Sequence, residues 1–317
     1  MIDVLKTTKY VADNSKLVKI STRAIEKLVN SVQESELDSF DLGYFGYNWP
    51  FDLQMELVFI FNAVNFCYWS GKGEQKWTVE IGGKKLDGAI ALFKCLEEEA
   101  NRNDSFFRPE TLANLNENDL KRILRGNAEI PLFDERLECL RELGQVTKDR
   151  YGDYLKIIEN SEHDAMKLVE TITINFPRFN DVSEYSGKSI GFYKRAQLNV
   201  NMINSILVSV GQAPMLNIDK LTAFADYKVP QILRGMGIVK YSNTLSKKID
   251  DYELIPVNSR EEVEIRANTV WAVELIREEL SKTFPVTSPE VDTVLWTRSQ
   301  KKEPGEKPYH RTLTTAY

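Results

Sequence analysis

The sequence predicts a mainly α-helical protein with one small β-hairpin. Apolar residues recur at three- and four-residue spacing in most of its longer segments, as they do along the buried face of a helix. Only one short segment alternates apolar and polar residues in the manner of a strand. Hydrophobic residues make up 42% of the chain, enough for a sizeable core, and no internal repeat or long low-complexity linker interrupts it. We therefore expect residues 1–317 to form a single compact unit, as one large domain or as two helical lobes with the functional site between them.

The first strong helix signal follows Pro50, because proline is common in the first turn of a helix. In the segment LQMELVFIFNAVNF, Leu53, Leu57 and Ile60 share one face, while Val58 and other apolar side chains occupy the remaining faces. A helix that is apolar on most sides has to be surrounded by other elements. We expect this helix at the centre of the protein.

The predicted hairpin lies in KWTVEIGGKKLDG. Trp77, Val79 and Ile81 alternate with polar residues, and Gly82 and Gly83 suit a tight two-residue turn. No other segment carries a clear strand signal, so this hairpin is the only β element that the sequence predicts.

Amphipathic patterns predict the remaining helices. One of them stops at Gly211, a residue type that often follows a helix C-terminus. Another begins with Ser259 and Glu262, which have the spacing of a capping box. These helices are predicted at residues 86–99, 119–126, 133–144, 189–211 and 259–280.

Charge and metal-binding residues limit the class of function. The net charge is -6, from 41 Lys plus Arg against 47 Asp plus Glu, so a small or cationic ligand fits better than stable binding of duplex nucleic acid. The chain has three cysteines without a CxxC pair and only two histidines. We expect no structural zinc, no other metal or cofactor, and no disulfide framework. A monomer is expected.

The N-terminal segment MIDVLKTTKYVADNSK is charged throughout and does not resemble a signal peptide. No later run approaches the roughly 20 apolar residues of a membrane-spanning helix. We expect a cytoplasmic protein, and a nuclear location stays open.

The stretch LTAFADYKVPQILRGMGIVKYS places Asp226 among apolar and aromatic neighbours. Pro230 suits the first turn of a helix that ends near Gly235, so the carboxylate is expected just before a helix N-terminus. Two interpretations are open. Asp226 is either an ordinary N-cap, which requires no catalysis, or a reactive carboxylate. Gly235 and Gly237 by themselves suit a simple turn between helices.

A second candidate segment is NFCYWSGKGEQKW, which gathers Phe66, Trp69 and other aromatic residues around a flexible turn. Aromatic rings stack on heterocyclic bases, and Lys72 with the neighbouring glycine amides can approach an anion. The alternative is an aromatic cluster at the edge of the core, followed by a hairpin loop. The GKGE sequence lacks the form of a P-loop.

Two further segments carry basic side chains. Lys194 and Arg195 are adjacent in GFYKRAQLN and form either a phosphate-binding pair or a solvated surface doublet. The tail KPYHRTLTTAY holds His310 and Arg311 and is either a poorly ordered end or a strand or flap that closes a site.

Taken together, NFCYWSGKGEQKW, GFYKRAQL, LTAFADYKVPQIL, the SREEVEIRA helix and the HRT…Y terminus resemble the queuosine salvage protein family, the queuosine 5′-phosphate N-glycosidases. The resemblance runs in order from about residue 50 to the end of the sequence. It implies a mostly helical fold related to helix-hairpin-helix DNA glycosylases. It also implies an enzyme that hydrolyses the N-glycosidic bond of a small nucleotide to release queuine, a 7-deazaguanine micronutrient, for salvage into tRNA modification.

The resemblance places the family's catalytic aspartate on Asp226. A carboxylate at this position would stabilise the positive charge that builds on the ribose C1′ during cleavage, or would activate the attacking water. Apolar neighbours such as Phe224 and Tyr227 would reduce the screening of its charge and strengthen the effect. No metal is required by this mechanism.

The resemblance also implies a set of substrate-binding residues. Lys194 and the aromatic residues of NFCYWSGKGE fall where such proteins hold the nucleotide. Glu74 is a candidate partner for the cationic amine of queuine, while Lys72, Lys194 and Arg311 are candidates for the 5′-phosphate. The complete predicted set is Phe66, Trp69, Lys72, Glu74, Lys194, Tyr227, His310 and Arg311.

The sequence is also compatible with two other functions. A helix-hairpin-helix glycosylase or binding module for DNA or RNA would show a salt-sensitive affinity for polynucleotides. A non-enzymatic protein, either a nucleotide binder or a helical scaffold, would not cleave the substrate, and a scaffold would not be stabilised by any nucleotide.

Overall fold

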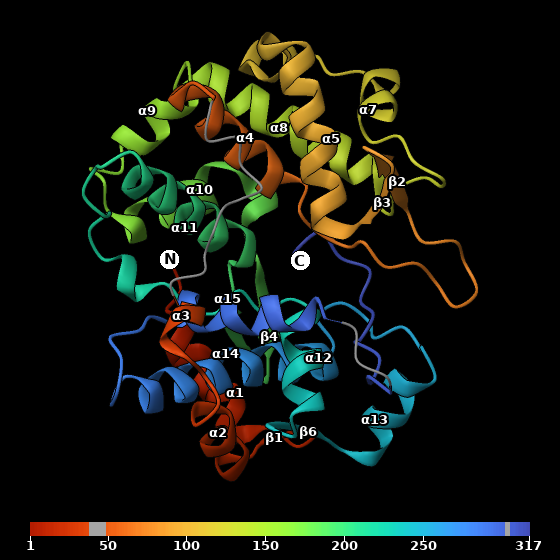
Figure 1. The fold of residues 1–317 in the computed structure, drawn as a ribbon, viewed down its shortest axis with the longest axis vertical. Helices are drawn as coiled ribbons and strands as arrows, with labels where there is room; N and C mark the ends of the chain where they lie inside the picture. The colour runs from red at the N-terminus through yellow and green to blue at the C-terminus, as the bar shows by residue number, and fades with distance from the viewer. Residues whose placement is uncertain (38–48, 302–304) are drawn as a thin grey trace.

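The computed structural model describes residues 1–37, 49–301 and 305–317, and most of these residues lie in helices (Figure 1). The predicted mainly α-helical class is confirmed, while the predicted kinship with helix-hairpin-helix DNA glycosylases stays a prediction. None of the described helices combines the length and apolar composition that crossing a membrane requires. The α-helices are α1 (Val4–Asn14), α2 (Thr22–Val29), α3 (Glu34–Leu37), α4 (Phe51–Ala63), α5 (Gly88–Arg102), α6 (Pro109–Ala113), α7 (Glu117–Ile123), α8 (Phe133–Arg150), α9 (Tyr154–Glu159), α10 (Ala165–Asn175), α11 (Lys194–Ser209), α12 (Lys228–Gly235), α13 (Asn243–Asp250), α14 (Arg260–Leu280) and α15 (Ser288–Ser299).

The prediction of a single β element is wrong. In the described part of the chain, six short strands form three two-stranded antiparallel sheets. The predicted hairpin is present as β2 (Thr78–Ile81) and β3 (Lys84–Asp87). The other two sheets pair β4 (Val182–Tyr185) with β5 (Lys188–Gly191), and β1 (Val18–Ile20) with β6 (Val239–Tyr241).

The sequence did not predict the two additional sheets, for a different reason in each case. The β4–β5 turn consists of Ser186 and Gly187, both with positive φ, and serine is an uncommon residue for such a turn. All but the first residue of strand β5 also fall inside the helix predicted at 189–211, which in the structure begins only at Lys194. Strands β1 and β6 lie far apart in the sequence, so no local pattern indicates that they pair.

Every predicted helix is present, although several ends differ. Helix α8 continues beyond its predicted end to Arg150. At the start of α14, Ser259 Oγ accepts the Glu262 N–H, as predicted, but the Glu262 carboxylate accepts the N–H of Asn258 and not that of Ser259. The capping box predicted here is therefore only half formed.

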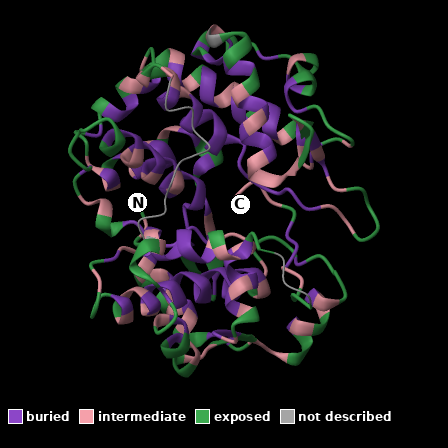
Figure 2. Ribbon diagram, in the orientation of Figure 1, coloured by how far each residue is buried: buried purple, intermediate pink, exposed green. Residues whose placement is uncertain are grey.

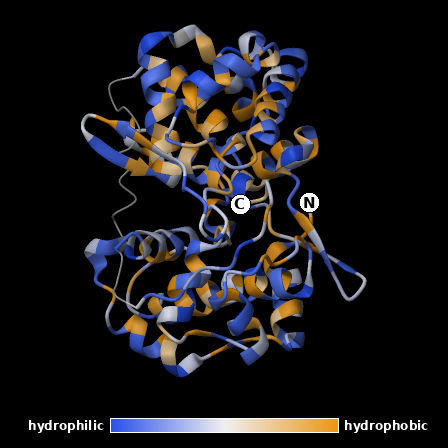
Figure 3. Cartoon of the chain, turned by 90° about the vertical axis from the view of Figure 1, so that its right-hand side faces the viewer, coloured by the Kyte–Doolittle hydropathy of each residue, from blue (hydrophilic) through white to orange (hydrophobic). Residues whose placement is uncertain are grey.

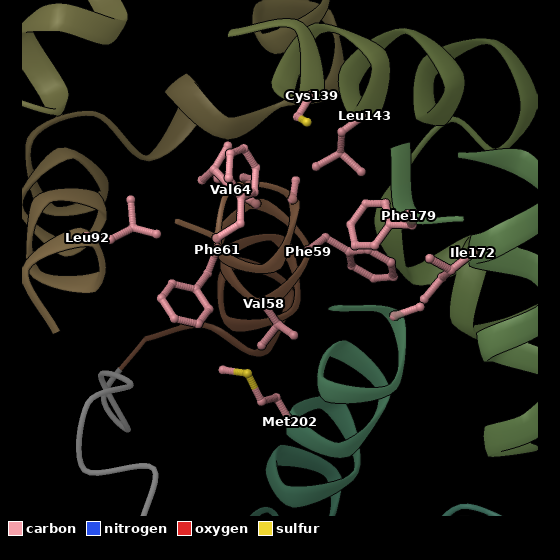
Figure 4. Close-up of a cluster of buried hydrophobic side chains, with 14 of the residues drawn as sticks. Val58, Phe59, Phe61, Val64, Leu92, Cys139, Leu143, Ile172, Phe179 and Met202 are labelled. Atoms are coloured by element: carbon pink, nitrogen blue, oxygen red, sulfur yellow. The ribbon is translucent and has the colours of Figure 1, made fainter. Parts of the chain in front are cut away.

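Helix α4 is the central helix that the sequence predicted. Figure 4 shows Val58, Phe59 and Phe61 leaving the helix in different directions, toward side chains of the surrounding helices. All residues from 57 to 63 are buried. Since apolar side chains cover most of the circumference of α4, the helix is stable where other elements enclose it.

Buried apolar side chains form two clusters. Figure 2 colours the buried residues purple, and Figure 3 colours the hydrophobic residues orange. The first cluster is built mainly by α4 to α11, and the second mainly by α2 and α12 to α15. Helix α14 belongs to both: Val263 and Ala267 pack in the first cluster, and Ile265 and Val273 in the second. This helix therefore joins the two halves of the molecule seen in Figure 1.

Helix α12 follows Asp226 closely and ends in a glycine turn. The Ile238 N–H donates to the Leu233 carbonyl and the Gly237 N–H donates to that of Arg234, which together form a Schellman motif. Gly237 has φ +70°, a backbone conformation that glycine adopts without strain. The predicted helix end near Gly235 is confirmed.

Candidate active site

A cavity of about 560 Å³ takes its walls from both hydrophobic clusters. Helices α4, α5 and α11 and the segment after α4 contribute from the first cluster, while the start of α12 and helix α15 contribute from the second. Most of the wall is apolar or aromatic. The charged side chains that line it are Lys76, Asp87, Lys194, Asp226, Lys228 and Asp292.

Asp226 lies in this cavity and also caps helix α12, from the position before the N-cap residue Tyr227 and not as the N-cap itself. Its Oδ1 accepts the N–H of Lys228 at 2.7 Å and the N–H of Val229 at 3.0 Å. Its Oδ2 makes no hydrogen bond to any residue that the structure describes. Burial raises the pKa of Asp226, and the positive charge of Lys194 opposes that rise. The capping role and a place in the cavity are therefore compatible.

Lys194 is the first residue of α11 and is buried. Its Nζ lies 3.5 Å from the Asn65 carbonyl oxygen, and its own N–H donates to Asp181 at 3.2 Å. Burial lowers the pKa of Lys194 to about 8, although the charge of Asp226 acts in the opposite direction. Lys194 and Asp226 thus line the same cavity, and the charge of each favours the ionised form of the other.

Asp292 is a second buried carboxyl in the cavity, and the sequence did not single it out. It lies on α15, and its Oδ1 accepts the Phe224 N–H at 3.0 Å. Burial, followed by the charge of Asp226, raises its pKa to about 8. Its signal in the sequence is weak: Thr287 and Glu290 form a capping box, and an aspartate then interrupts an apolar helix.

Aromatic side chains form the walls beside these charges. Phe66 and Tyr227 line the cavity, as does Tyr309, whose ring centroid lies 4.8 Å from that of Tyr227. Two buried guanidinium groups lie over the Phe66 ring, that of Arg136 at 4.4 Å and that of Arg195 at 5.1 Å from the ring centroid. Flat aromatic surfaces of this kind suit a heterocyclic base.

Residues predicted in the 69–74 segment lie away from this cavity. Trp69 is buried but is not part of the cavity wall. Lys72 and Glu74 are exposed, and the Glu74 carboxylate accepts the Gly71 N–H at 2.8 Å. Of the predicted set, the structure brings Phe66, Lys194, Asp226 and Tyr227 together.

His310 and Arg311 are buried behind the aromatic wall. His310 Nε2 lies 3.1 Å from the hydroxyl of Tyr317, a residue that lines the cavity. Burial, with the charge of Arg266, lowers the pKa of His310 to about 3, so the imidazole is neutral. The Arg311 guanidinium lies over the rings of Tyr252 and Tyr309, and its Nε and Nη1 find no hydrogen-bond partner among the described residues.

A buried ion pair connects the segments that carry Lys194 and Asp226. Arg266 of α14 donates to both carboxylate oxygens of Asp181, at 2.9 and 2.6 Å, and to the carbonyl of Ala225 at 3.2 Å. Since Asp181 also accepts the Lys194 N–H, one network fixes the start of α11 and the residue before Asp226. No group of three or more His, Cys, Asp or Glu in the described ranges is placed to bind a metal ion.

Comparisons with known proteins show the family to which this chain is similar. Residues 50–317 match the family model described as queuosine salvage protein. Several curated relatives carry the name queuosine 5′-phosphate N-glycosylase/hydrolase. One of them, a protein of Sphaerobacter thermophilus, is 34% identical over 326 residues, and the alignment covers 100% of this chain and 98% of the relative. Those of Bos taurus and Mus musculus are each 29% identical, and each alignment covers 98% of this chain and 98% of the relative.

Proposed function

Since the chain belongs to the queuosine salvage protein family, we propose that it hydrolyses the N-glycosidic bond of queuosine 5′-phosphate and releases queuine. The relatives named above carry this activity in their names. The observation that supports the proposal most directly is the cavity in which the Asp226 carboxylate faces Lys194 between aromatic walls.

In the proposed reaction, the Asp226 carboxylate acts at the ribose. Cleavage of the glycosidic bond builds positive charge on C1′, which a nearby anion stabilises most effectively where water is scarce. The two backbone N–H groups on Oδ1 fix the carboxylate in position before the substrate arrives. The remaining oxygen, Oδ2, is then available to the oxocarbenium-like carbon or to the water that attacks it.

Lys194 supports the ionised form of Asp226. Burial alone would favour a protonated carboxyl, and the ammonium group of Lys194 is the largest opposing influence on the pKa of Asp226. The queuine base would pack against the aromatic side chains that line the cavity, among them Phe66 and Tyr227.

The 5′-phosphate needs cationic side chains, and the cavity offers two that the sequence did not single out. Lys228 lies near the Tyr309 ring, and Lys76 is paired with Asp87 at 2.9 Å. We place the phosphate beside these two lysines. The roles predicted for Trp69, Lys72, Glu74, His310 and Arg311 stay predictions.

The expected partner is a free nucleotide and not duplex nucleic acid, in keeping with the net charge of -6. The monomeric state, the cytoplasmic location and the arrangement as a single catalytic unit with two helical lobes stay predictions.

The test is chromatographic detection of free queuine after the purified protein has been incubated with queuosine 5′-phosphate. Queuosine and guanosine 5′-phosphate serve as comparison substrates. We expect queuine release from the queuosine compounds only, and Asp226→Asn to lower it by at least about 100-fold. Asparagine keeps an oxygen to cap α12, so the melting temperature of this variant should stay close to that of the wild type. Full activity of Asp226→Asn would remove the carboxylate from the reaction.

A further inference from the structure

We propose that Asp292 is the general acid that protonates the departing base. This inference rests on the proposed function, and it adds the side chain that donates a proton to the queuine base as the base leaves. The structural basis is the meeting of two carboxyl groups and one ammonium group in a single cavity, brought there by three separate segments of the chain.

The two carboxyl groups are held by neighbouring parts of one backbone segment. Phe224 donates its N–H to Asp292, while the N–H groups two and three residues beyond Asp226 donate to Asp226. Asp292 and Asp226 therefore have fixed positions relative to each other, although they lie on different elements. Asp292 is only 4% exposed, so bulk water solvates it poorly.

The charges around Asp292 favour its protonated form. The charged groups that act on it are Asp226, in the segment before α12, and Lys194 at the start of α11. Of these two charges, the negative charge of Asp226 has the larger influence on Asp292 and disfavours a second carboxylate beside it. Asp226 accepts two backbone N–H groups and Asp292 accepts one, which favours ionisation of Asp226. Consistent with this geometry, the pKa of Asp292 is raised to about 8.

The chemistry of the base explains the need for an acid. Ordinary purines can be protonated at N7 before they leave, but a 7-deazaguanine has carbon at that position. When the C1′–N9 bond breaks, its electron pair moves to the base, and Asp292 supplies a proton to a nitrogen or oxygen of that base. Water forms the new bond to C1′ and gives its proton to Asp226.

The proton balance closes within this pair of carboxyl groups. Before the reaction Asp292 is protonated and Asp226 is ionised, and after it the two states are exchanged. Transfer of one proton from Asp226 to Asp292, directly or through solvent, restores the starting state without any further reactant.

The test compares a poor and a good leaving group in Asp292→Asn. Its substrates are queuosine 5′-phosphate and 4-nitrophenyl β-D-ribofuranoside 5-phosphate, whose nitrophenolate leaves without protonation. We expect Asp292→Asn to lower kcat for queuosine 5′-phosphate by about 100-fold or more and to change nitrophenolate release by less than about fivefold. Asp226→Asn should lower both rates. Asp251→Asn, an exposed aspartate outside the cavity, serves as the control and should change neither.

The other outcomes are equally informative. Equal loss with both substrates, or no loss with either, would overturn the role of Asp292 as an acid. Calorimetric titration with queuine gives a second measurement: Asp292→Asn should bind queuine within about threefold of the wild type, and a loss of binding that matches the loss of kcat would contradict proton donation. If wild-type protein releases nothing from queuosine 5′-phosphate, the proposed function itself fails, and the role of Asp292 fails with it.

Discussion

Asp226 shows how a single side chain can cap a helix and line a cavity at the same time. One of its oxygens accepts the first N–H groups of α12, which is the work of a cap. The same carboxyl lines a cavity beside a buried lysine, which an ordinary surface cap does not do. A substitution that preserves the cap therefore separates the structural role from the chemical one.

Lys194 provides a prediction on pH dependence. The acid limb of kcat/KM should follow protonation of Asp226, because the proposed mechanism needs its carboxylate. The positive charge of Lys194 lowers the pKa of Asp226, so removing that charge lets the pKa rise. In Lys194→Met, which keeps a long apolar stem, the acid limb should move to higher pH, and the loss of activity should be greater at pH 6 than at pH 8.

A pH profile of kcat/KM for queuosine 5′-phosphate measures this shift. Lys247→Met is the matched control, because Lys247 is exposed on α13 and pairs with Asp251 outside the cavity. An unchanged acid limb in Lys194→Met would show that Lys194 does not control the ionisation of Asp226.

At the scale of single elements, the end of α4 is stabilised by two arginines. Arg136 donates to the carbonyls of Val64, Phe66 and Cys67, and Arg195 donates to those of Asn62 and Ala63. Cationic groups at a helix C-terminus interact favourably with its dipole and satisfy carbonyls that lack a partner in the helix. This arrangement fixes the backbone around Phe66 and so helps to place an aromatic wall of the cavity.

The glycine turn after α12 yields a pair of substitutions with opposite expected effects. Gly237 has φ +70°, so alanine there should cost about 1–2 kcal/mol of unfolding free energy. Gly235 lies in the last turn of α12, and a Cβ added there meets nothing within 4 Å. Alanine at 235 should therefore stabilise the protein by about 0.4–1 kcal/mol.

Urea unfolding of Gly237→Ala and Gly235→Ala measures both effects against the wild type. The two glycines are two residues apart, so general effects of the local sequence are shared. Equal changes for the two variants would contradict the assignment of the left-handed conformation to Gly237 alone.

At the scale of the whole molecule, α14 links the two hydrophobic clusters with buried charges as well as with apolar side chains. Arg266 and Asp181 form a buried pair between α14 and the residue before β4. Removing one partner of such a pair leaves an uncompensated charge. We expect Arg266→Met to lower the unfolding free energy by about 3–5 kcal/mol.

A double-mutant cycle tests that explanation. If the cost arises from the unpaired Asp181 carboxylate, Arg266→Met combined with Asp181→Asn should be less destabilised than Arg266→Met alone when both are unfolded in urea. Arg277→Met, which breaks a partly exposed pair with Glu274, is the control and should cost no more than about 1 kcal/mol. Strict additivity of the two changes would contradict electrostatic coupling across the molecule.

Much of this fold follows from local sequence patterns. The apolar surface of the segment after Pro50 predicted a central helix, and α4 occupies that place. The Gly82-Gly83 turn predicted the β2–β3 hairpin, and Pro230 with Gly235 predicted the extent of α12. Such features depend on residues within a few positions of one another, so a single sequence contains the information needed to predict them.

Only the tertiary structure decided which distant residues meet. Asp292 joins Asp226 and Lys194 because α15 packs against α12, and because α15, the segment before α12 and the start of α11 line one cavity. Local periodicity in the sequence does not indicate that packing. In the same way, Lys72 and Glu74 belong to an aromatic segment that enters the cavity, yet their own side chains point to solvent. Periodicity, together with proline and glycine positions, determined the longest described helices, the β2–β3 hairpin and the place of Asp226 before a helix. The packing of elements remote in sequence determined the composition of its cavity, because burial and charge there depend on contacts that form only in the folded chain.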